Sequence, residues 1–177
     1  MREQLKSFHW QKKNLCESDF NDTLNMTRRM IKTRQEHLNL LKQKYIALNP
    51  DRVDDIMDDI CYYNGIENQY LWHFCLWRLQ AVFEGIITTV YLKKDTRKLV
   101  GLNSKLHAMK KAGFSLKPEW DEEMTQWSQL RNALSHCPPT RFELCMITDS
   151  DVQEYVNLLH EIMTRWKEEA RSVLIVE

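Results

Sequence analysis

The stretch that decides the fold runs from Tyr70 to Tyr91 and reads YLWHFCLWRLQAVFEGIITTVY. Its apolar side chains fall on nearly every face of a helix, which is typical of a helix that other helices surround. Four polar or charged residues interrupt the stretch: His73, Arg78, Gln80 and Glu84. Because an arginine at the centre of a membrane span costs about 2.5–3.5 kcal/mol, we predict a buried helix of a globular bundle and no membrane segment.

The composition around this helix favours the same fold class. The chain has 177 residues, of which 43% are hydrophobic and 28% charged, as in an ordinary globular domain. It contains only four glycines and four prolines, whereas a β-sandwich or barrel needs many tight turns built from these residues. We therefore predict an all-α, up-and-down bundle of five to six helices. It forms a single domain over residues 1–177, in which residues 1–20 are a candidate for a loosely attached N-terminal segment.

Apolar spacing and capping residues predict two helices before the central one. Asp22 is the expected N-cap of a long helix that ends at Asn49-Pro50. A short acidic helix is expected from Asp51 to Tyr63, because Asn64-Gly65 is a common turn signal. These signals place a turn or kink directly before the central helix.

The second half of the chain predicts three more helices. Asn103 or Ser104 is the expected cap of a short helix that runs through Lys111 to Gly113. The next helix has Pro118 in its first turn and ends at Pro138-Pro139, because each proline disfavours helical geometry in the residue before it. The last helix is expected from a cap at Ser150 or Asp149 to about Val173, and only Arg141 to Ile147 has the pattern of an extended segment.

The charges balance, with 25 lysines and arginines against 25 aspartates and glutamates. This balance argues against a protein that coats nucleic acid or anionic lipid by bulk attraction, so any site for a polyanion must be local. Two basic clusters, Arg28 to Lys44 and Lys93 to Lys111, are either surfaces that guide RNA or solvated helix faces.

The cysteines and the N-terminus indicate a cellular compartment. The five cysteines are an odd number without a C-x-x-C pair, and the first residues, MREQLKSFHW, contain no apolar run. Both features are typical of a protein of the reducing cytoplasm. The spacing of the cysteines and histidines fits no closed zinc site, and we predict neither a bound metal nor a cofactor.

The residues with the clearest chemical potential lie in the segment QLRNALSH, from Gln129 to His136, at the end of a predicted helix. At about 100° per residue, Asn132 and His136 lie within roughly 40° of each other, and Arg131 reaches around the helix from about 140° away. A helix C-terminus favours the charged imidazole and a nearby arginine opposes it, so the histidine can be poised near neutrality.

This segment has two interpretations. Arginine matches a phosphate and histidine transfers protons, and these are the two functions that metal-free cleavage of an RNA phosphodiester requires. The alternative is a histidine that caps the last carbonyls of the helix beside a surface arginine.

The sequence Arg131-Asn132-Ala133-Leu134-Ser135-His136 resembles the R-x(4–6)-H motif of the HEPN superfamily, the higher eukaryote and prokaryote nucleotide-binding domains. The order of helices is also similar, over about residues 20 to 173. The resemblance implies an up-and-down helical bundle that carries the motif near the end of its penultimate long helix. Many members of the superfamily are metal-independent endoribonucleases that act as toxins or in defence against phage. Their site usually forms where two copies of the motif face each other across a homodimer.

Carried over to this chain, the resemblance implies that Arg131 binds phosphate, Asn132 orients or contacts the substrate, and His136 performs the acid–base chemistry. RNA would be the substrate, and a second copy of the chain would supply the second His136. The chain departs from the smallest members of the family in a longer segment between Cys137-Pro138-Pro139 and Asp149.

Two further questions remain open at this level. The alternative function is a non-catalytic HEPN-like module that binds a nucleotide or a partner protein, such as a nucleotidyltransferase-like antitoxin. Arg78 and Glu84 need partners on an otherwise apolar helix. They either pair inside the bundle, or one of them reaches the patch of Arg131 and His136.

Overall fold

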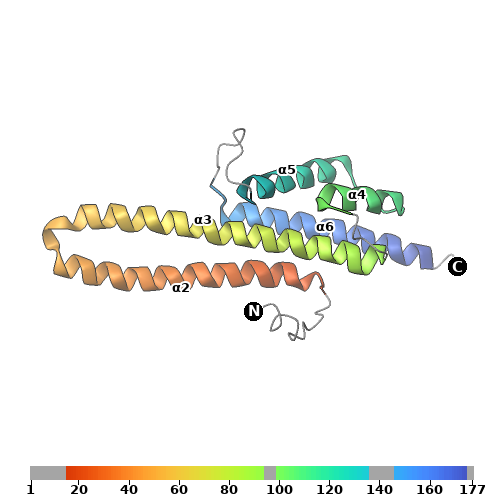
Figure 1. Ribbon diagram of the computed structural model, residues 1–177. Helices are drawn as coiled ribbons and strands as arrows, with labels where there is room; N and C mark the ends of the chain where they lie inside the picture. Colours follow the sequence, from red (N-terminus) through yellow and green to blue (C-terminus); the bar gives the residue numbers. More distant parts are fainter. Residues whose placement is uncertain (1–14, 94–98, 136–145, 175–177) are drawn as a thin grey trace, which may run out of the picture.

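The computed structural model describes residues 15–93, 99–135 and 146–174 of the chain. Within these ranges the chain forms an all-α bundle of five α-helices without a β-strand, which confirms the predicted fold class (Figure 1). The α-helices are α2 (Ser18–Leu48), α3 (Val53–Ile86), α4 (Gly101–Lys111), α5 (Pro118–Ser135) and α6 (Asp149–Leu174). None of them combines the length and the apolarity that a membrane span requires.

Helices α2 and α3 form a long antiparallel hairpin that extends beyond the other helices (Figure 1). A single 3-10 turn, Pro50–Arg52, joins them, so the predicted end at Asn49-Pro50 is confirmed. The predicted break at Asn64-Gly65 is wrong, because α3 runs through it without interruption. The Asn64 side chain donates a hydrogen bond to Gln35 of α2 over 2.8 Å. This contact between the helices stabilises helical geometry at Asn64-Gly65, although the pair is a common turn signal.

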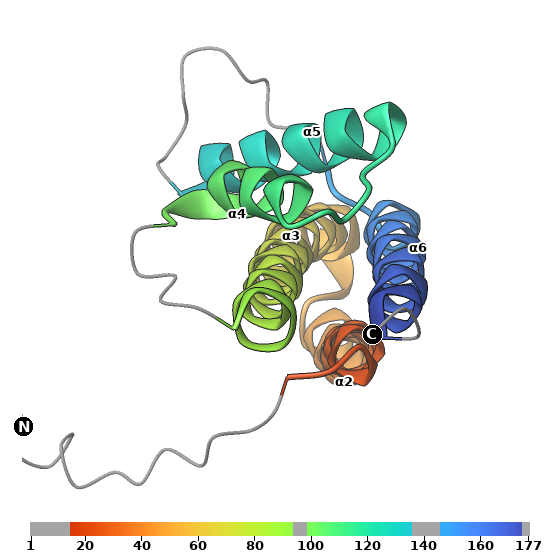
Figure 2. The ribbon, with the colours of Figure 1, turned by 90° about the vertical axis from the view of Figure 1, so that its right-hand side faces the viewer.

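Helix α3 lies at the centre of the bundle, with α2, α6 and the α4–α5 pair on three of its sides (Figure 2). The fourth side carries Tyr70, Phe74 and Trp77, whose exposed fractions are 57%, 61% and 37%. The expected covering of this segment by other helices is therefore met on three sides, and on the fourth no helix of the described residues covers it. An apolar pattern that covers the whole helix cannot indicate which side the fold leaves uncovered.

A cluster of aromatic rings joins α3 to α6 at one end of the bundle. Trp166 is fully buried, and its ring stacks on Phe83 with the centroids 5.8 Å apart. Its indole Nε1 donates a hydrogen bond to the backbone oxygen of Ser115 over 2.7 Å. Tyr91 and Phe114 complete the cluster at centroid distances of 5.7 and 6.1 Å from Trp166. The cluster therefore fixes both the end of α3 and the connection between α4 and α5.

At the end of α3 the backbone continues as a π-helical turn, Ile87–Leu92. The hydroxyls of Thr88 and Thr89 both donate hydrogen bonds to the carbonyl oxygen of Gly85. Gly85 packs closely against Leu15, and a Cβ atom at this position would require the end of the Leu15 side chain to shift.

The starts of α2 and α4 differ from the predicted caps. Helix α2 begins at Ser18, one turn before the predicted cap Asp22. The Asp19 carboxylate accepts a hydrogen bond from the backbone N–H of Cys16 over 2.9 Å and so stabilises the earlier start. Helix α4 begins at Gly101, and its N-cap position is Val100, not Asn103 or Ser104.

Helix α6 begins at Asp149, and its cap is Thr148, which precedes both predicted candidates. The backbone N–H of Thr148 donates to Asp151 over 2.7 Å, and the N–H of Asp151 donates back to the Thr148 hydroxyl over 3.4 Å. This reciprocal pair is a capping box. Two other local signals are confirmed: Pro118 is the first residue of α5, and Gly113 has a φ of 92° after α4.

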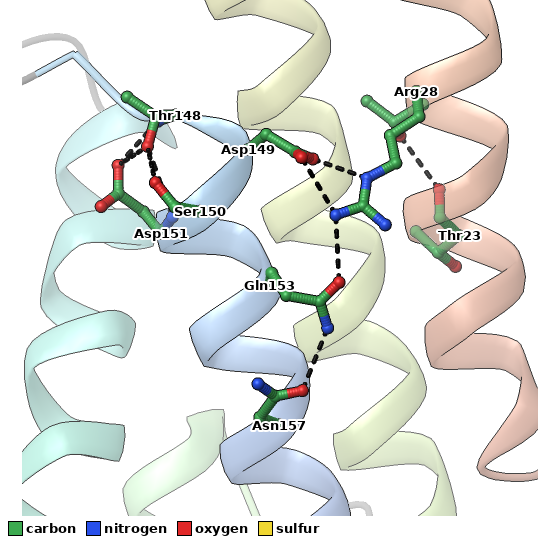
Figure 3. A network of polar contacts seen from close by, with 9 residues as sticks. Thr23, Arg28, Thr148, Asp149, Ser150, Asp151, Gln153 and Asn157 are labelled. Atoms are coloured by element: carbon green, nitrogen blue, oxygen red, sulfur yellow. Dashed lines mark hydrogen bonds and ion pairs between the residues drawn. The ribbon is translucent and has the colours of Figure 1, made fainter.

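A polar network ties the start of α6 to α2 (Figure 3). The Arg28 guanidinium donates two hydrogen bonds to the Asp149 carboxylate, over 2.7 and 3.0 Å, and a third to Gln153 over 3.0 Å. The hydrogen bond to Asp149 raises the pKa of Arg28. Because the Arg28 and Asp149 side chains are 36% and 53% exposed, we expect the pair to orient α6 more than to stabilise the fold.

Trp166→Ala should lower the free energy of unfolding by about 3–5 kcal/mol, because it leaves a cavity among the three remaining rings. The matched control is Tyr62→Ala, which removes a ring that is 65% exposed and should change this free energy by less than about 0.5 kcal/mol. Urea unfolding followed by circular dichroism measures both values. Equal effects of the two substitutions would contradict the assignment of this cluster as the core.

Candidate functional site

Two of the three residues predicted from the motif lie on the last turns of α5. The Arg131 side chain is 29% exposed, and Asn132 is exposed. Ser135 is the last residue of α5. The predicted acid–base residue, His136, lies outside the described residues, as does most of the predicted extended segment Arg141 to Ile147. The role of His136 therefore stays a prediction.

Arg131 is held by contacts on two sides. Its Nη1 donates a hydrogen bond to the Asn132 side-chain oxygen over 2.8 Å. Its Nη2 lies 3.7 Å from a carboxylate oxygen of Glu84 on α3. The sequence left two alternatives open for Glu84, and both hold in the structure. Glu84 pairs with a cation inside the bundle, and it also reaches Arg131 of the motif. Arg78, by contrast, is exposed on α3.

The Glu84 carboxylate is the centre of this arrangement. Only 12% of the side chain is exposed. It forms an ion pair with Lys105 of α4, whose side chain is 15% exposed, and it accepts a hydrogen bond from Gln80 over 2.8 Å. One carboxylate therefore faces two cations, Lys105 and Arg131. We name these three residues the Glu84 cluster. A formal charge of +1 remains on it, which favours an anion at its exposed side.

Lys105 was predicted only as part of the second basic cluster, Lys93 to Lys111, and not as a member of the site. A signal for it exists, because Lys105 falls between Leu102, Leu106 and Met109, which are the buried residues of α4. A lysine on the apolar side of a helix requires a partner inside the fold. The sequence pattern does not show that this partner is Glu84.

Tyr155 of α6 is buried near enough to the Glu84 cluster for the charges of Glu84 and Arg131 to act on its hydroxyl. Its side chain is fully buried, and its ring lies 4.7 Å from the ring of Trp127, centroid to centroid. Burial, and then the negative charge of Glu84, raise the pKa of Tyr155, whereas the positive charge of Arg131 lowers it. Tyr155 therefore keeps its proton. Within the described chain its hydroxyl and the side-chain oxygen of Gln80 are buried without a hydrogen-bond partner.

The other predicted surfaces offer fewer groups that could bind a ligand or catalyse a reaction. In the first basic cluster, Arg28 is bound to Asp149 and Arg34 forms an ion pair with Glu67, so both arginines have a structural contact. Among the described residues, no group of three or more histidine, cysteine, aspartate or glutamate side chains is placed to hold a metal ion. The Glu84 cluster, at the end of the helix that carries the motif, is therefore the candidate site.

Comparison of the chain with family models, with curated proteins and with solved structures finds no match in any of the three.

Glu84→Ala should lower the free energy of unfolding by about 3 kcal/mol, because it leaves Lys105 and Arg131 partly buried without their carboxylate. The control on the same helix is Arg78→Ala, at an exposed position. This substitution should change the free energy of unfolding by less than about 0.5 kcal/mol. Chemical denaturation measures the difference. A Glu84 variant as stable as the Arg78 variant would show that the cluster does not hold α4 and α5 on α3.

Proposed function

We propose that the protein is a metal-independent endoribonuclease of HEPN type that acts as a toxin or in phage defence. The observation that supports this proposal best is the position of Arg131. The largely buried carboxylate of Glu84 holds the Arg131 guanidinium from one side, and the Arg131 side chain stays 29% exposed at the end of the helix that carries the motif. An arginine that is fixed in this way can meet a phosphate without first being ordered.

The proposed reaction is attack of a ribose 2′-OH on the adjacent phosphate. His136 removes the 2′-OH proton, the new bond forms between the 2′-oxygen and phosphorus, and the bond from phosphorus to the 5′-oxygen breaks. A second imidazole donates a proton to the leaving 5′-oxygen. The products are a 2′,3′-cyclic phosphate and a free 5′-OH, so no water, metal or oxidant is consumed in this step.

In this scheme Arg131 stabilises the negative charge that develops on the phosphate oxygens. Asn132 fixes one edge of the guanidinium through its side-chain oxygen. Glu84 and Lys105 are positioning residues, because they orient Arg131 from inside the bundle. A second copy of the chain, in a homodimer, would supply the second His136.

A different function is favoured by one observation. Tyr70 and Phe74 are more than half exposed on α3, and exposed apolar surface of this kind is typical of protein contacts. It suits a non-catalytic HEPN-like module whose partner is another protein, such as a nucleotidyltransferase-like antitoxin. Such a module would bind its partner with the motif intact and would not cleave RNA.

Arg131→Ala and His136→Ala should each lower the rate of RNA cleavage about 100- to 1,000-fold in the presence of EDTA, because each removes a group that acts in the transition state. Arg78→Ala is the control, since it removes an exposed arginine outside the Glu84 cluster. The measurement is cleavage of a labelled RNA, with chemical analysis of the 3′ ends for cyclic phosphate. Full activity of the double variant Arg131→Ala/His136→Ala would reject the proposal.

A further inference from the structure

A groove runs along the α2–α3 hairpin on the side that faces away from α6. It has a volume of about 510 Å³, and we name it the hairpin groove after the residues that line it: Met26, Arg29, Met30, Thr33, Arg34, His37 and Leu71. Helix α6 packs against both α2 and α3 on the other side of the hairpin (Figure 2). Arg28, which binds α6, lies about 160° from Met30 around α2. The same two helices therefore offer a second groove, which no helix of the described residues fills.

The floor of the hairpin groove is apolar and exposed. Met26 and Met30 are 51% and 48% exposed, and Leu71 of α3 lies between them and the rest of the open face of α3. Phe74, one helical turn after Leu71, extends this surface. Methionine side chains are flexible and adapt to an apolar partner. Exposed apolar surface of this kind is typical of a protein contact.

The walls of the hairpin groove favour a helical occupant. Both walls are α-helices, whose backbone N–H and C=O groups are already bonded within each helix, so the groove offers an occupant side chains only. An extended peptide would lose the hydrogen bonds of its own backbone to water, whereas a helix satisfies them internally. From Met26 to His37 the groove follows α2 for about 16 Å, at 1.5 Å per residue. This length suits about three turns of a helix.

The charges of the hairpin groove favour an acidic occupant. Three of its lining residues are basic and none is acidic. Arg34 is already paired with Glu67 of α3. Arg29 and His37 form no ion pair or hydrogen bond within the part of the chain that the structure describes. A partner with carboxylates beside its apolar residues would supply the missing contacts.

Charge also argues against two other occupants. Residues 1–14 of this chain, MREQLKSFHWQKKN, carry four lysines and arginines against one glutamate, so they would bring positive charge to a basic groove. A second copy of the chain that docked through the same groove would place Arg29 of both copies in one interface. Both arrangements set like charges together, which is unfavourable.

We infer that the hairpin groove binds an acidic amphipathic helix of a partner protein. The apolar stripe of this helix packs on Met26, Met30 and Leu71, as amphipathic helices do in other grooves between helices. Its carboxylates pair with Arg29 and accept hydrogen bonds from His37. The inference goes beyond the proposed function and does not depend on the nuclease chemistry.

The test is the binding of a fluorescein-labelled peptide to the full-length protein, measured by fluorescence anisotropy. The probe is a helix-forming peptide of about 16 residues, long enough for four turns, with one stripe of leucines, glutamates beside the stripe and alanines elsewhere. Met30→Glu and Arg29→Glu should each raise the dissociation constant of this peptide at least about tenfold, because each places a carboxylate against the carboxylates of the probe.

A charge-reversed peptide, with lysine in place of each glutamate, tests the electrostatic part of the inference. It should bind the wild-type protein at least about tenfold more weakly than the acidic peptide does. Arg29→Glu should bind the lysine peptide more tightly than the wild type does. A peptide with the same residues as the acidic probe in an order without an apolar stripe should bind at least about tenfold more weakly than the probe.

The matched control is Val100→Glu, which charges an apolar residue that is 80% exposed just before α4. Val100→Glu should bind the acidic peptide as the wild type does, and thermal unfolding should show that all three variants are folded. A wild-type protein that does not bind the acidic peptide, or a Met30→Glu variant that binds it with wild-type affinity, would overturn the inference. Equal binding of the acidic and the lysine peptide would also overturn it.

Two further results would assign the hairpin groove to another occupant and so overturn the inference. The first is a single-stranded RNA that displaces the peptide and whose own binding is lost in Met30→Glu. The second is a wild-type protein that self-associates in sedimentation and a Met30→Glu variant that does not. The cleavage assay stays independent of these results. An active nuclease whose groove ignores the acidic peptide would keep the proposed function and reject this inference, and a peptide-binding protein that leaves RNA intact would do the reverse.

Discussion

The carboxylate of Glu84 is the constraint that joins the candidate site to the fold. It lies on α3 and contacts Lys105 of α4 and Arg131 of α5, so a single side chain connects three helices. A carboxylate with only 12% of its side chain exposed is costly to bury unless cations and hydrogen-bond donors surround it. Lys105, Arg131 and Gln80 are these groups, and their positions are therefore fixed together.

This arrangement accounts for the electrostatics of the site. Lys105 balances the charge of Glu84, so the charge of Arg131 stays available to an anion at the surface. The buried Tyr155 nearby keeps its proton, since burial raises its pKa, and it adds no charge to the site. A fixed arginine near a neutral tyrosine is suited to charge that develops on a phosphate during a reaction.

Local signals in the sequence predicted helix boundaries correctly at positions where a proline or glycine restricts the backbone conformation. Asn49-Pro50 ends α2, Gly113 adopts the positive φ after α4, and Pro118 starts α5. The prediction failed where contacts between helices override a local signal. Asn64-Gly65 reads as a turn, but hydrogen bonds between Asn64 and α2 keep α3 continuous.

The candidate site could be predicted only in part, for a similar reason. Arg131 and Asn132 are recognisable because they belong to one short motif. The pair between Glu84 and Lys105 joins residues 21 positions apart on different helices, and no spacing within one helix reveals it. The open side of α3 was also not predictable, because the pattern of the helix is apolar on nearly all faces. His136 lies outside the described residues, so its role rests on the sequence alone.

The most direct test of the account is a double-mutant cycle on the rate of RNA cleavage, with Glu84→Gln, Arg131→Lys and the double variant. If Glu84 acts by positioning Arg131, the two losses should not add, and the coupling free energy should be at least about 1 kcal/mol. The double variant should then be no slower than the slower single variant. Losses that add within about 0.5 kcal/mol would contradict the account, because Glu84 and Arg131 would then act independently.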